Sequence, residues 1–231
     1  MTLPLVSAIV PCYNDGRYIE DTIASIQNQT YQNIEVIVVD DGSTDTHTLK
    51  VLGSLKLGTI QVLWQPNGKT SKARNLGFKH AKGTYLLAID ADDILEATFV
   101  EKSVHILEEY PKIGAVSSWV LGFGYQNFIW TPRGGGVKNF IEDINCSANA
   151  IIRREVWEMN EGFDESMVYG YEDWEFWINT TKKGYLVHII EEFLIYYRRT
   201  WGSRAKDAVD HRDEIKAYLI NKHPDVFQHF G

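Results

Sequence analysis

The sequence predicts an α/β protein whose doubly wound, mostly parallel sheet is flanked by helices. Two mostly apolar runs, at 35–39 and 84–89, lead directly into carboxylates at 40–41 and 90–93. Such apolar runs are typical of strands buried on both faces, as in parallel sheets. Segments with helical periodicity alternate with the strands at the spacing of βαβ units. Because ligands bind at the carboxyl edge of such sheets, both acidic clusters are candidate sites.

Strands and helices alternate through the first half of the chain. In the first helix, Ile19, Ile23 and Ile26 recur at helical spacing, and Ser71 is expected to cap the third helix. The expected elements, in order, are a strand over Val6–Val10 closed by Pro11, a helix over Tyr18–Gln29, a strand over Ile34–Val39, a helix over Thr44–Leu55, a strand over Ile60–Trp64 followed by a turn at 66–68, a helix from Ser71 to about Lys82, a strand over Tyr85–Ile89 and a helix over Glu96–Glu109.

The second half is less regular. Residues 120–145 carry several glycines and aromatic residues without a clear period, so we expect a loop-rich, partly mobile stretch. The expected elements around it are a strand over Ile113–Trp119, a strand over Ala148–Ile152, a helix over Tyr171–Lys183, two short strands within Leu186–Tyr197 and a helix over Asp207–Lys222. No repeat and no linker divides the chain, which predicts a single domain over 1–231.

Composition and charge exclude several classes of function. A chain of 231 residues with 44% hydrophobic content can bury a substantial core, and a net charge of −8 argues against a nucleic-acid partner. Cys12 and Cys146 are too few and too far apart for a disulfide framework or a thiolate zinc site. The sequence shows neither a signal peptide nor a run of the roughly 20 apolar residues that a membrane helix needs. We expect a cytoplasmic protein, and peripheral membrane contact stays compatible with the sequence.

The cluster at 90–93 has the spacing of a metal site. Asp90 and Asp92 stand at i and i+2, and a sharp turn can bring both carboxylates onto one hard divalent cation. Two carboxylates about 4 Å apart repel each other by roughly 4 kcal/mol at an effective dielectric near 20, so they favour a cation between them. Mg²⁺ or Mn²⁺ at this place would bridge the oxygens of a diphosphate. The pair Asp40 and Asp41, taken alone, fits a simple strand-ending turn equally well.

The turn after the first strand excludes two kinds of nucleotide site. Residues 11–17 contain no G-x-G-x-x-G, and the chain contains no P-loop motif, so dinucleotide and P-loop chemistry are set aside. Tyr13 can present its ring to a nucleotide base or can simply pack. Lys69, Lys72 and Arg74 place cations at a helix N-terminus, where they can bind an anion or remain solvated.

A third acidic segment begins the helix expected over 171–183. Acidic residues are favourable in a first helical turn, which accounts for Glu172 and Asp173 without any function. Asp173 and Trp177 are four positions apart and share a helix face. This arrangement suits a carboxylate base beside an aromatic platform for a sugar ring, although Trp177 can equally be a core residue.

Six segments, in this order, resemble the family 2 glycosyltransferases and together cover about residues 5–200. They are V-P-C-Y-N at 10–14, V-D-D-G-S at 39–43, K-A-R-N-L-G at 72–77, D-A-D-D at 90–93, G-F-D-E at 162–165 and Y-E-D-W at 171–174. The resemblance implies a GT-A fold, a nucleotide-sugar donor such as a UDP-sugar, and a glycan or lipid-linked carbohydrate acceptor. It also implies a divalent cation, Mn²⁺ or Mg²⁺, and inversion at the anomeric carbon by direct displacement.

The resemblance also implies roles for parts of the chain and for single residues. Residues 1–112 would bind the nucleotide sugar, 113–205 would hold the acceptor and the catalytic group, and 206–231 would form a C-terminal helix. The residues expected at the nucleotide are Pro11, Tyr13, Asp41 at the base, Arg74 near the base and Asp90 at the ribose. Asp92 would bind the metal, and Asp173 would act as general base. Secondary candidates are Asn14, Asp40, Asp93, Glu172, Trp177 and Arg198.

One departure from the family pattern concerns the metal. Many relatives carry a histidine shortly after the last strand, whereas here Trp201 occupies that neighbourhood and cannot ligate a metal. Arg198, Arg199 and Arg204 could instead neutralise the diphosphate.

Two alternative functions remain. One is a degenerate domain that binds a nucleotide sugar or glycan without turnover, and the other is a sugar-phosphate nucleotidyltransferase, although its usual glycine-rich entry loop is missing. A haloacid-dehalogenase-like phosphatase is excluded, because its nucleophilic aspartate would fall on Val39.

Overall fold

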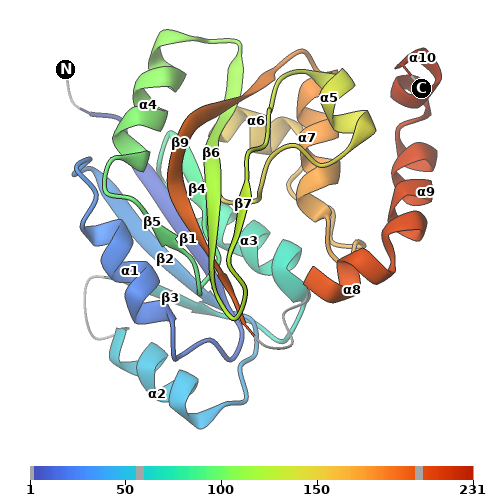
Figure 1. Cartoon of the computed structure of the whole chain (residues 1–231). Helices are drawn as coiled ribbons and strands as arrows, with labels where there is room; N and C mark the ends of the chain where they lie inside the picture. The colour runs from blue at the N-terminus through green and yellow to red at the C-terminus, as the bar shows by residue number, and fades with distance from the viewer. Residues whose placement is uncertain (1–2, 56–59, 201–204, 231) are drawn as a thin grey trace.

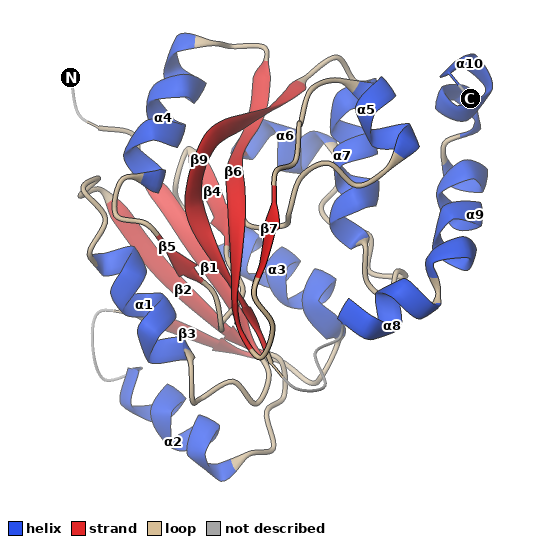
Figure 2. Ribbon diagram, in the orientation of Figure 1, coloured by secondary structure: helices blue, strands red, loops and turns tan. Residues whose placement is uncertain are grey.

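A nine-stranded sheet runs through the part of the chain that the computed structural model describes, which is residues 3–55, 60–200 and 205–230. Its strands are β1 (Val6–Cys12), β2 (Ile34–Asp40), β3 (Gln61–Trp64), β4 (Tyr85–Ala88), β5 (Ile94–Leu95), β6 (Ile113–Gly124), β7 (Phe128–Trp130), β8 (Ala150–Arg153) and β9 (Leu186–Arg199). Their order across the sheet is β3-β2-β1-β4-β8-β6-β9-β5, with β7 paired to β6 (Figure 2). Strands β5, β7 and β8 run against the common direction of the other six.

Helices cover both faces of this sheet (Figure 1). They are α1 (Ile19–Gln27), α2 (Thr46–Leu55), α3 (Lys69–His80), α4 (Phe99–Glu109), α5 (Val137–Glu142), α6 (Arg154–Met159), α7 (Glu172–Lys182), α8 (Ala205–Asp210), α9 (Arg212–Lys222) and α10 (Pro224–Phe230). Apolar side chains of α1, α2 and α4 form one core with one face of the sheet, and those of α3, α6 and α7 form a second core with the other. Alternate residues of β1 serve the two cores, since Val6, Ala8 and Val10 belong to the first and Ile9 to the second. The predicted doubly wound α/β fold is therefore confirmed.

The prediction of a loop-rich stretch over 120–145 is wrong in part. Strand β6 continues to Gly124, and β7 and α5 follow it. A Cβ on Gly122 would lie 2.1 Å from ring atoms of Phe128, so this glycine makes room for an aromatic residue of the neighbouring strand. Gly122, which looked like a loop residue, is therefore a position of close strand contact, whereas residues 131–136 do form a loop.

Other local predictions also differ from the structure. The segment 186–197 forms one long strand rather than two. The apolar pattern of its sequence is interrupted where the pairing register against β6 shifts, between Ile190 and Phe193. Helix α3 begins at Lys69 without a side-chain cap, so Ser71 is not its N-cap. The helix expected over Asp207–Lys222 is divided into α8 and α9, and a further helix, α10, starts at Pro224, a residue that suits a first helical position. No helix in the described part of the chain is long and apolar enough to cross a membrane.

The parallel strands bring their carboxyl ends to one edge of the sheet. Strands β1 and β2 pair in register up to Cys12 and Asp40, and β4 ends at Ala88, two residues before Asp90. The antiparallel strand β8 starts at the same edge, because Ala150 pairs with Ala88. Residues that follow β1, β2 and β4 and precede β8 therefore meet in space.

Candidate active site

Asp41 is fixed by the turn that leads into α3. Its Oδ1 atom accepts hydrogen bonds from Gln65 Nε2 at 2.6 Å and from the backbone N of Gly68 at 2.7 Å. The side chain of Asn67 donates a further bond to the Asp41 carbonyl oxygen at 3.0 Å. Gly42, with φ of 75°, allows the chain to turn sharply after this residue. Asp41 is thus a buried, oriented acceptor at the strand edge.

Asp40 and Asn14 shape the two loops around Asp41. Both oxygens of Asp40 accept from the backbone N of Ser43 at 3.2 Å. Asn14 Oδ1 accepts from the backbone N atoms of Thr44 and Asp45 at 2.8 and 2.9 Å, which ties the loop after β1 to the loop after β2. These contacts give Asp40 and Asn14 a structural role in the described structure.

The residues around β1 present one aromatic ring beside a cavity. Tyr13 is 44% exposed, whereas Pro11 lies within β1 and is buried. A cavity of about 640 Å³ opens next to them and is lined by Asn14, Arg17, Tyr18, Asp45, His47 and Thr200. The exposed ring and this cavity are the accessible features of the loop, and the buried Pro11 can act there through the shape of the backbone.

Arg74 connects the strand edge to helix α7. Its Nη2 atom pairs with Asp90 Oδ1 at 2.7 Å, and its Nη1 atom pairs with Glu172 Oε1 at 2.5 Å. The Arg74 side chain is only 2% exposed, so it is not part of a solvated cationic patch with Lys69 and Lys72. Burial alone would lower the pKa of Arg74, but its carboxylate neighbours hold the pKa above the usual range. Buried guanidinium groups paired in this way orient their partners.

Asp93 is a structural member of the 90–93 cluster. It is fully buried, and its two oxygens accept from Asn149 Nδ2 at 2.5 Å and from the backbone N of Arg198 at 2.9 Å. Burial raises the pKa of the Asp93 carboxyl well above its usual range. Because both of its oxygens are already engaged, Asp93 is poorly suited to bind a metal.

Asp90 and Asp92 are the oxygen donors that a cation could use. Burial, followed by repulsion from Asp90 and Asp15, raises the pKa of the Asp92 carboxyl to about 7. A divalent cation would relieve this repulsion, and carboxylate oxygens are the ligands that Mg²⁺ and Mn²⁺ prefer. The described residues contain no group of three or more His, Cys, Asp or Glu arranged to hold a metal, so a cation here would need further oxygens from a ligand.

Arg198 supports this cluster from β9. Its Nε atom donates to the backbone oxygen of Asp92 at 2.9 Å, and its Nη2 atom pairs with Asp21 at 3.1 Å. The guanidinium also lies 4.7 Å from the ring centroids of both Tyr18 and Phe123. Arg198 is therefore engaged in holding the turn of the cluster. Arg199 lies 5.4 Å from the ring centroid of Tyr197, whereas Trp201 and Arg204 lie outside the described residues.

Asp173 lies in the first turn of α7, next to the partner of Arg74. Its Oδ1 atom accepts from the backbone N of Trp174 at 2.9 Å. Burial and then the charge of Glu172 raise the pKa of Asp173 to about 7, while Arg74 acts in the opposite direction. A carboxyl group with a pKa near neutrality is suited to accept a proton at physiological pH.

The interpretation of Trp177 as a sugar platform is wrong. Trp177 is fully buried, and its ring packs edge-on against Phe176 with centroids 5.1 Å apart. Trp174 is also buried, and its Nε1 atom donates to the carbonyl oxygen of Phe140 at 2.5 Å. The spacing of Asp173 and Trp177 does place them on one helix face, but that face turns into the core one turn after Asp173.

Sequence reasoning missed one residue of the cluster. Asn149 donates to Asp93 and, through Oδ1, accepts from the backbone N of Asp90 at 3.2 Å. It immediately precedes β8, whose antiparallel direction brings its start to the carboxyl edge. The sequence does show a polar segment directly before the apolar strand β8. That segment points to the site only when β8 is known to run antiparallel to β4, because only then does its start lie at the carboxyl edge.

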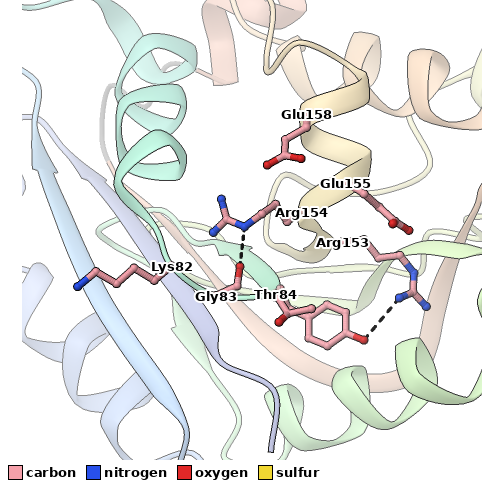
Figure 3. A pocket seen from close by; sticks show the side chains of 8 residues that line it. Lys82, Gly83, Thr84, Arg153, Arg154, Glu155 and Glu158 are labelled. Atoms are coloured by element: carbon pink, nitrogen blue, oxygen red, sulfur yellow. Dashed lines mark hydrogen bonds between the residues drawn. The ribbon is translucent and has the colours of Figure 1, made fainter.

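A second cavity lies away from these residues. It has a volume of about 400 Å³ and is lined by Lys82, Gly83, Thr84, Tyr85, Arg153, Arg154, Glu155 and Glu158 (Figure 3). Its lining comes from the start of β4 and the end of β8, which form the edge of the sheet opposite Asp90. Both cationic and acidic side chains line it, so it lacks the single sign of charge that would select a charged ligand.

Comparisons with known proteins agree with the fold. Residues 7–159 match the family described as Glycosyl transferase family 2. An uncharacterized glycosyltransferase of Haemophilus influenzae is 30% identical over 245 residues, covering 95% of this chain and 72% of that protein. Glycosyltransferase GlyG of Streptococcus pneumoniae is 39% identical over 108 residues, which is 46% of this chain and 36% of GlyG. The matched stretch is thus about a third of GlyG.

Solved structures of TarS from S. aureus show the same arrangement of elements. The structure in complex with UDP-GlcNAc covers 95% of this chain and 72% of that chain, with a TM-score of 0.74 and 22% sequence identity. The structure in complex with UDP gives a TM-score of 0.72 over 95% of this chain and 71% of that chain. These similarities confirm the expected GT-A fold.

Proposed function

The chain belongs to glycosyltransferase family 2, and from this premise we propose that it is an inverting enzyme that uses a nucleotide-diphosphate sugar. The proposed donor is a UDP-sugar, and the proposed acceptor is a hydroxyl group of a glycan or of a lipid-linked carbohydrate. Structures of TarS with UDP and with UDP-GlcNAc support the choice of donor, because their fold covers 95% of this chain.

The ion pairs of Arg74 are the observation that carries this proposal. Asp90 follows a strand at the donor edge, whereas Glu172 stands beside Asp173 on α7, and Arg74 holds both carboxylates at 2.7 and 2.5 Å. One buried guanidinium therefore sets the position of the candidate base relative to the donor edge. An enzyme that must align an acceptor with a donor needs such a fixed relation between the two.

The donor edge supplies the proposed binding groups. Asp41 would accept a hydrogen bond from the nucleotide base, since its carboxylate is already oriented by the turn before α3. The exposed ring of Tyr13 would pack against the base. Asp90 would accept from a ribose hydroxyl with the oxygen that does not face Arg74.

A divalent cation, when bound, would be held by Asp92 and would neutralise negative charge on the diphosphate. The raised pKa of Asp92 supports this assignment, because crowded carboxylates gain from a cation between them. Mn²⁺ and Mg²⁺ both fit a site made of carboxylate oxygens.

Asp173 is the proposed general base. Its carboxylate would remove the proton of the acceptor hydroxyl, and the hydroxyl oxygen would form a bond to the anomeric carbon as the bond to the diphosphate oxygen breaks. Attack from the face opposite the leaving group inverts the configuration at that carbon. A pKa near 7 keeps a large fraction of Asp173 ionised at neutral pH while leaving it basic enough to accept a proton.

Calorimetric titration with nucleotide diphosphates tests the donor assignment. In the presence of Mn²⁺ we expect saturable binding of UDP to the full chain, and weaker binding of ADP and GDP. Asp41→Asn should weaken UDP binding, whereas Lys102→Met, which changes an exposed residue of α4, should leave it unchanged. Absence of binding to every nucleotide diphosphate would overturn the proposal.

A further inference from the structure

The turn before α7 has an unusual backbone conformation. Tyr171 has φ of 58° and ψ of 23°, a left-handed conformation that side-chain-bearing residues adopt only at a cost in free energy. Gly170 before it has φ of 106°. Such a turn keeps its shape when its surroundings restrain it. Because Tyr171 directly precedes Glu172 and Asp173, the contacts that hold Tyr171 also set the position of the candidate base.

Arg212, the first residue of α9, makes such contacts. Its Nη1 atom donates to the Tyr171 hydroxyl at 3.1 Å, and its guanidinium lies 5.6 Å from the centroid of the Tyr171 ring. Its Nη2 atom pairs with Asp143, at the end of α5, at 2.5 Å. The same guanidinium lies 5.4 Å from the ring centroid of Trp174. Arg212 therefore joins the turn to α5 and to the first residues of α7.

Two neighbouring residues of the turn contact the same C-terminal segment. The ring of Tyr169 stacks on His211, with centroids 3.9 Å apart and planes 4° apart. A Cβ built on Gly170 would lie 3.1 Å from the Cβ of Ala208, so the backbone passes close to α8. Ala208 lies in α8, Arg212 begins α9, and His211 stands between the two helices, so all three contacts come from one short stretch of the chain. Figure 1 shows α8 and α9 on the side of the molecule where α7 lies.

We propose that Arg212 is a positioning residue for glycosyl transfer, which acts through Tyr171 to hold the turn that orients the Asp173 carboxylate. This inference rests on the proposed function. Glu172 is held from the other side by Arg74 of α3, so the acidic pair stands between an arginine of the donor half and an arginine of the C-terminal segment. Arg212 itself contacts the turn and α5, and its effect on the reaction is indirect.

Hydrogen exchange tests whether Arg212 holds the turn. In Arg212→Met we expect faster exchange of the backbone amides of residues 169–174 and unchanged exchange in α3. The matched control is Arg133→Met, because the Arg133 side chain is 71% exposed and its pairing distance to Glu142 is 4.0 Å. Tyr171→Phe keeps the ring and removes the hydroxyl, so it should speed exchange of the same amides to a smaller degree. Unchanged exchange of residues 169–174 in Arg212→Met would overturn the proposal.

Steady-state kinetics test whether the restraint matters for the reaction. The quantity to measure is the rate of UDP release from UDP-GlcNAc in the presence of Mn²⁺, with water as the acceptor. Arg212→Met should lower kcat by about tenfold to a hundredfold, since small misplacements of a reacting group have effects of this size. KM for UDP-GlcNAc and Kd for UDP should stay within about twofold, because only the positioning of the base is changed.

A double variant separates the effect through Tyr171 from a general loss of structure. If Arg212 acts through the Tyr171 hydroxyl, Arg212→Met combined with Tyr171→Phe should be no slower than Arg212→Met alone. Additive losses, or a loss confined to KM, would contradict the proposal. Failure of the unaltered chain to bind UDP would instead reject the proposed function, and hydrogen exchange would then still decide whether Arg212 holds the turn.

Discussion

Two carboxyl groups of the site, those of Asp92 and Asp173, have pKa values raised to about 7, and burial is the largest cause for both. Their surroundings give them different uses. The carboxylates of Asp90 and Asp15 repel that of Asp92 and so favour a cation, whereas Asp173 is subject to the opposing charges of Glu172 and Arg74. The position of Asp90 and Asp92 at a strand end was enough to predict them as site residues from the sequence. The ion pair of Arg74 with Glu172 was not predictable, because it joins residues 98 positions apart and no local sequence pattern indicates it.

Replacement of the candidate base should separate turnover from donor binding. Asp173→Asn keeps the size of the side chain and removes the group that accepts the proton, so we expect kcat to fall by about 10²- to 10⁴-fold. The Kd for UDP should change little, because Asp173 lies outside the donor edge. Rates of UDP release and calorimetric titration of the same preparation check both expectations. Turnover equal to that of the unaltered chain would show that another group is the base.

The pH dependence of turnover should follow the ionisation of Asp173. The carboxyl must be deprotonated to accept a proton, so with saturating Mn²⁺ the rate should be constant well above pH 7 and fall tenfold per unit below about pH 7. Glu172→Gln removes a charge that raises the pKa of Asp173, and the fall should therefore move to lower pH. An unchanged profile in that variant would contradict the assignment of Asp173.

Among the elements, α3 illustrates how close packing against the sheet places a functional side chain. A Cβ on Gly77 would lie 2.5 Å from Cγ2 of Ile9 and 3.1 Å from Cγ2 of Val39. Both neighbours are buried β-branched residues that cannot turn away, so glycine at this position allows the helix to approach β1 and β2. This close approach also fixes Arg74, which lies less than one turn earlier on the same helix.

Two glycine substitutions test this packing. Alanine is favoured over glycine inside helices by about 1 kcal/mol, but overpacking of a core costs about 1 to 3 kcal/mol. Gly77→Ala should therefore lower the free energy of unfolding by about 1 kcal/mol or more and weaken UDP binding. Gly53→Ala in α2 meets no atom within 4 Å and should raise the free energy of unfolding by roughly 0.5 to 1 kcal/mol. Urea unfolding of both variants measures these changes, and a more stable Gly77→Ala would refute the packing argument.

Elements with strong local periodicity were predictable from the sequence, and elements defined by distant partners were not. The strands and helices up to residue 109 follow from apolar spacing, with boundaries shifted by a few residues, except the two-residue strand β5, which was not predicted. The hairpin of β6 and β7 depends on Phe128 fitting against Gly122, and the apparent break in β9 depends on its register against β6. The sequence could not decide between the two interpretations of Trp177 for a similar reason, since burial of a helix face depends on what packs against it.

At the scale of the whole molecule, one sheet edge and one helix end form the site. The edge follows from the parallel strand order, while the C-terminal segment holds the helix end through Arg212 and Tyr171. The predicted division of the chain into a donor half, an acceptor half and a C-terminal helix stays a prediction. The described structure shows contacts between these parts, through Arg74 and through Arg212.

The most direct test of the account is the configuration of the sugar that the enzyme releases. Proton NMR of UDP-GlcNAc incubated with the full chain and Mn²⁺ distinguishes the two anomers of free sugar at early times, before they equilibrate. If Asp173 activates water on the face opposite the diphosphate, the α-linked donor should yield the β-anomer together with UDP. Initial release of the α-anomer, or no release from any nucleotide sugar tested, would contradict the account.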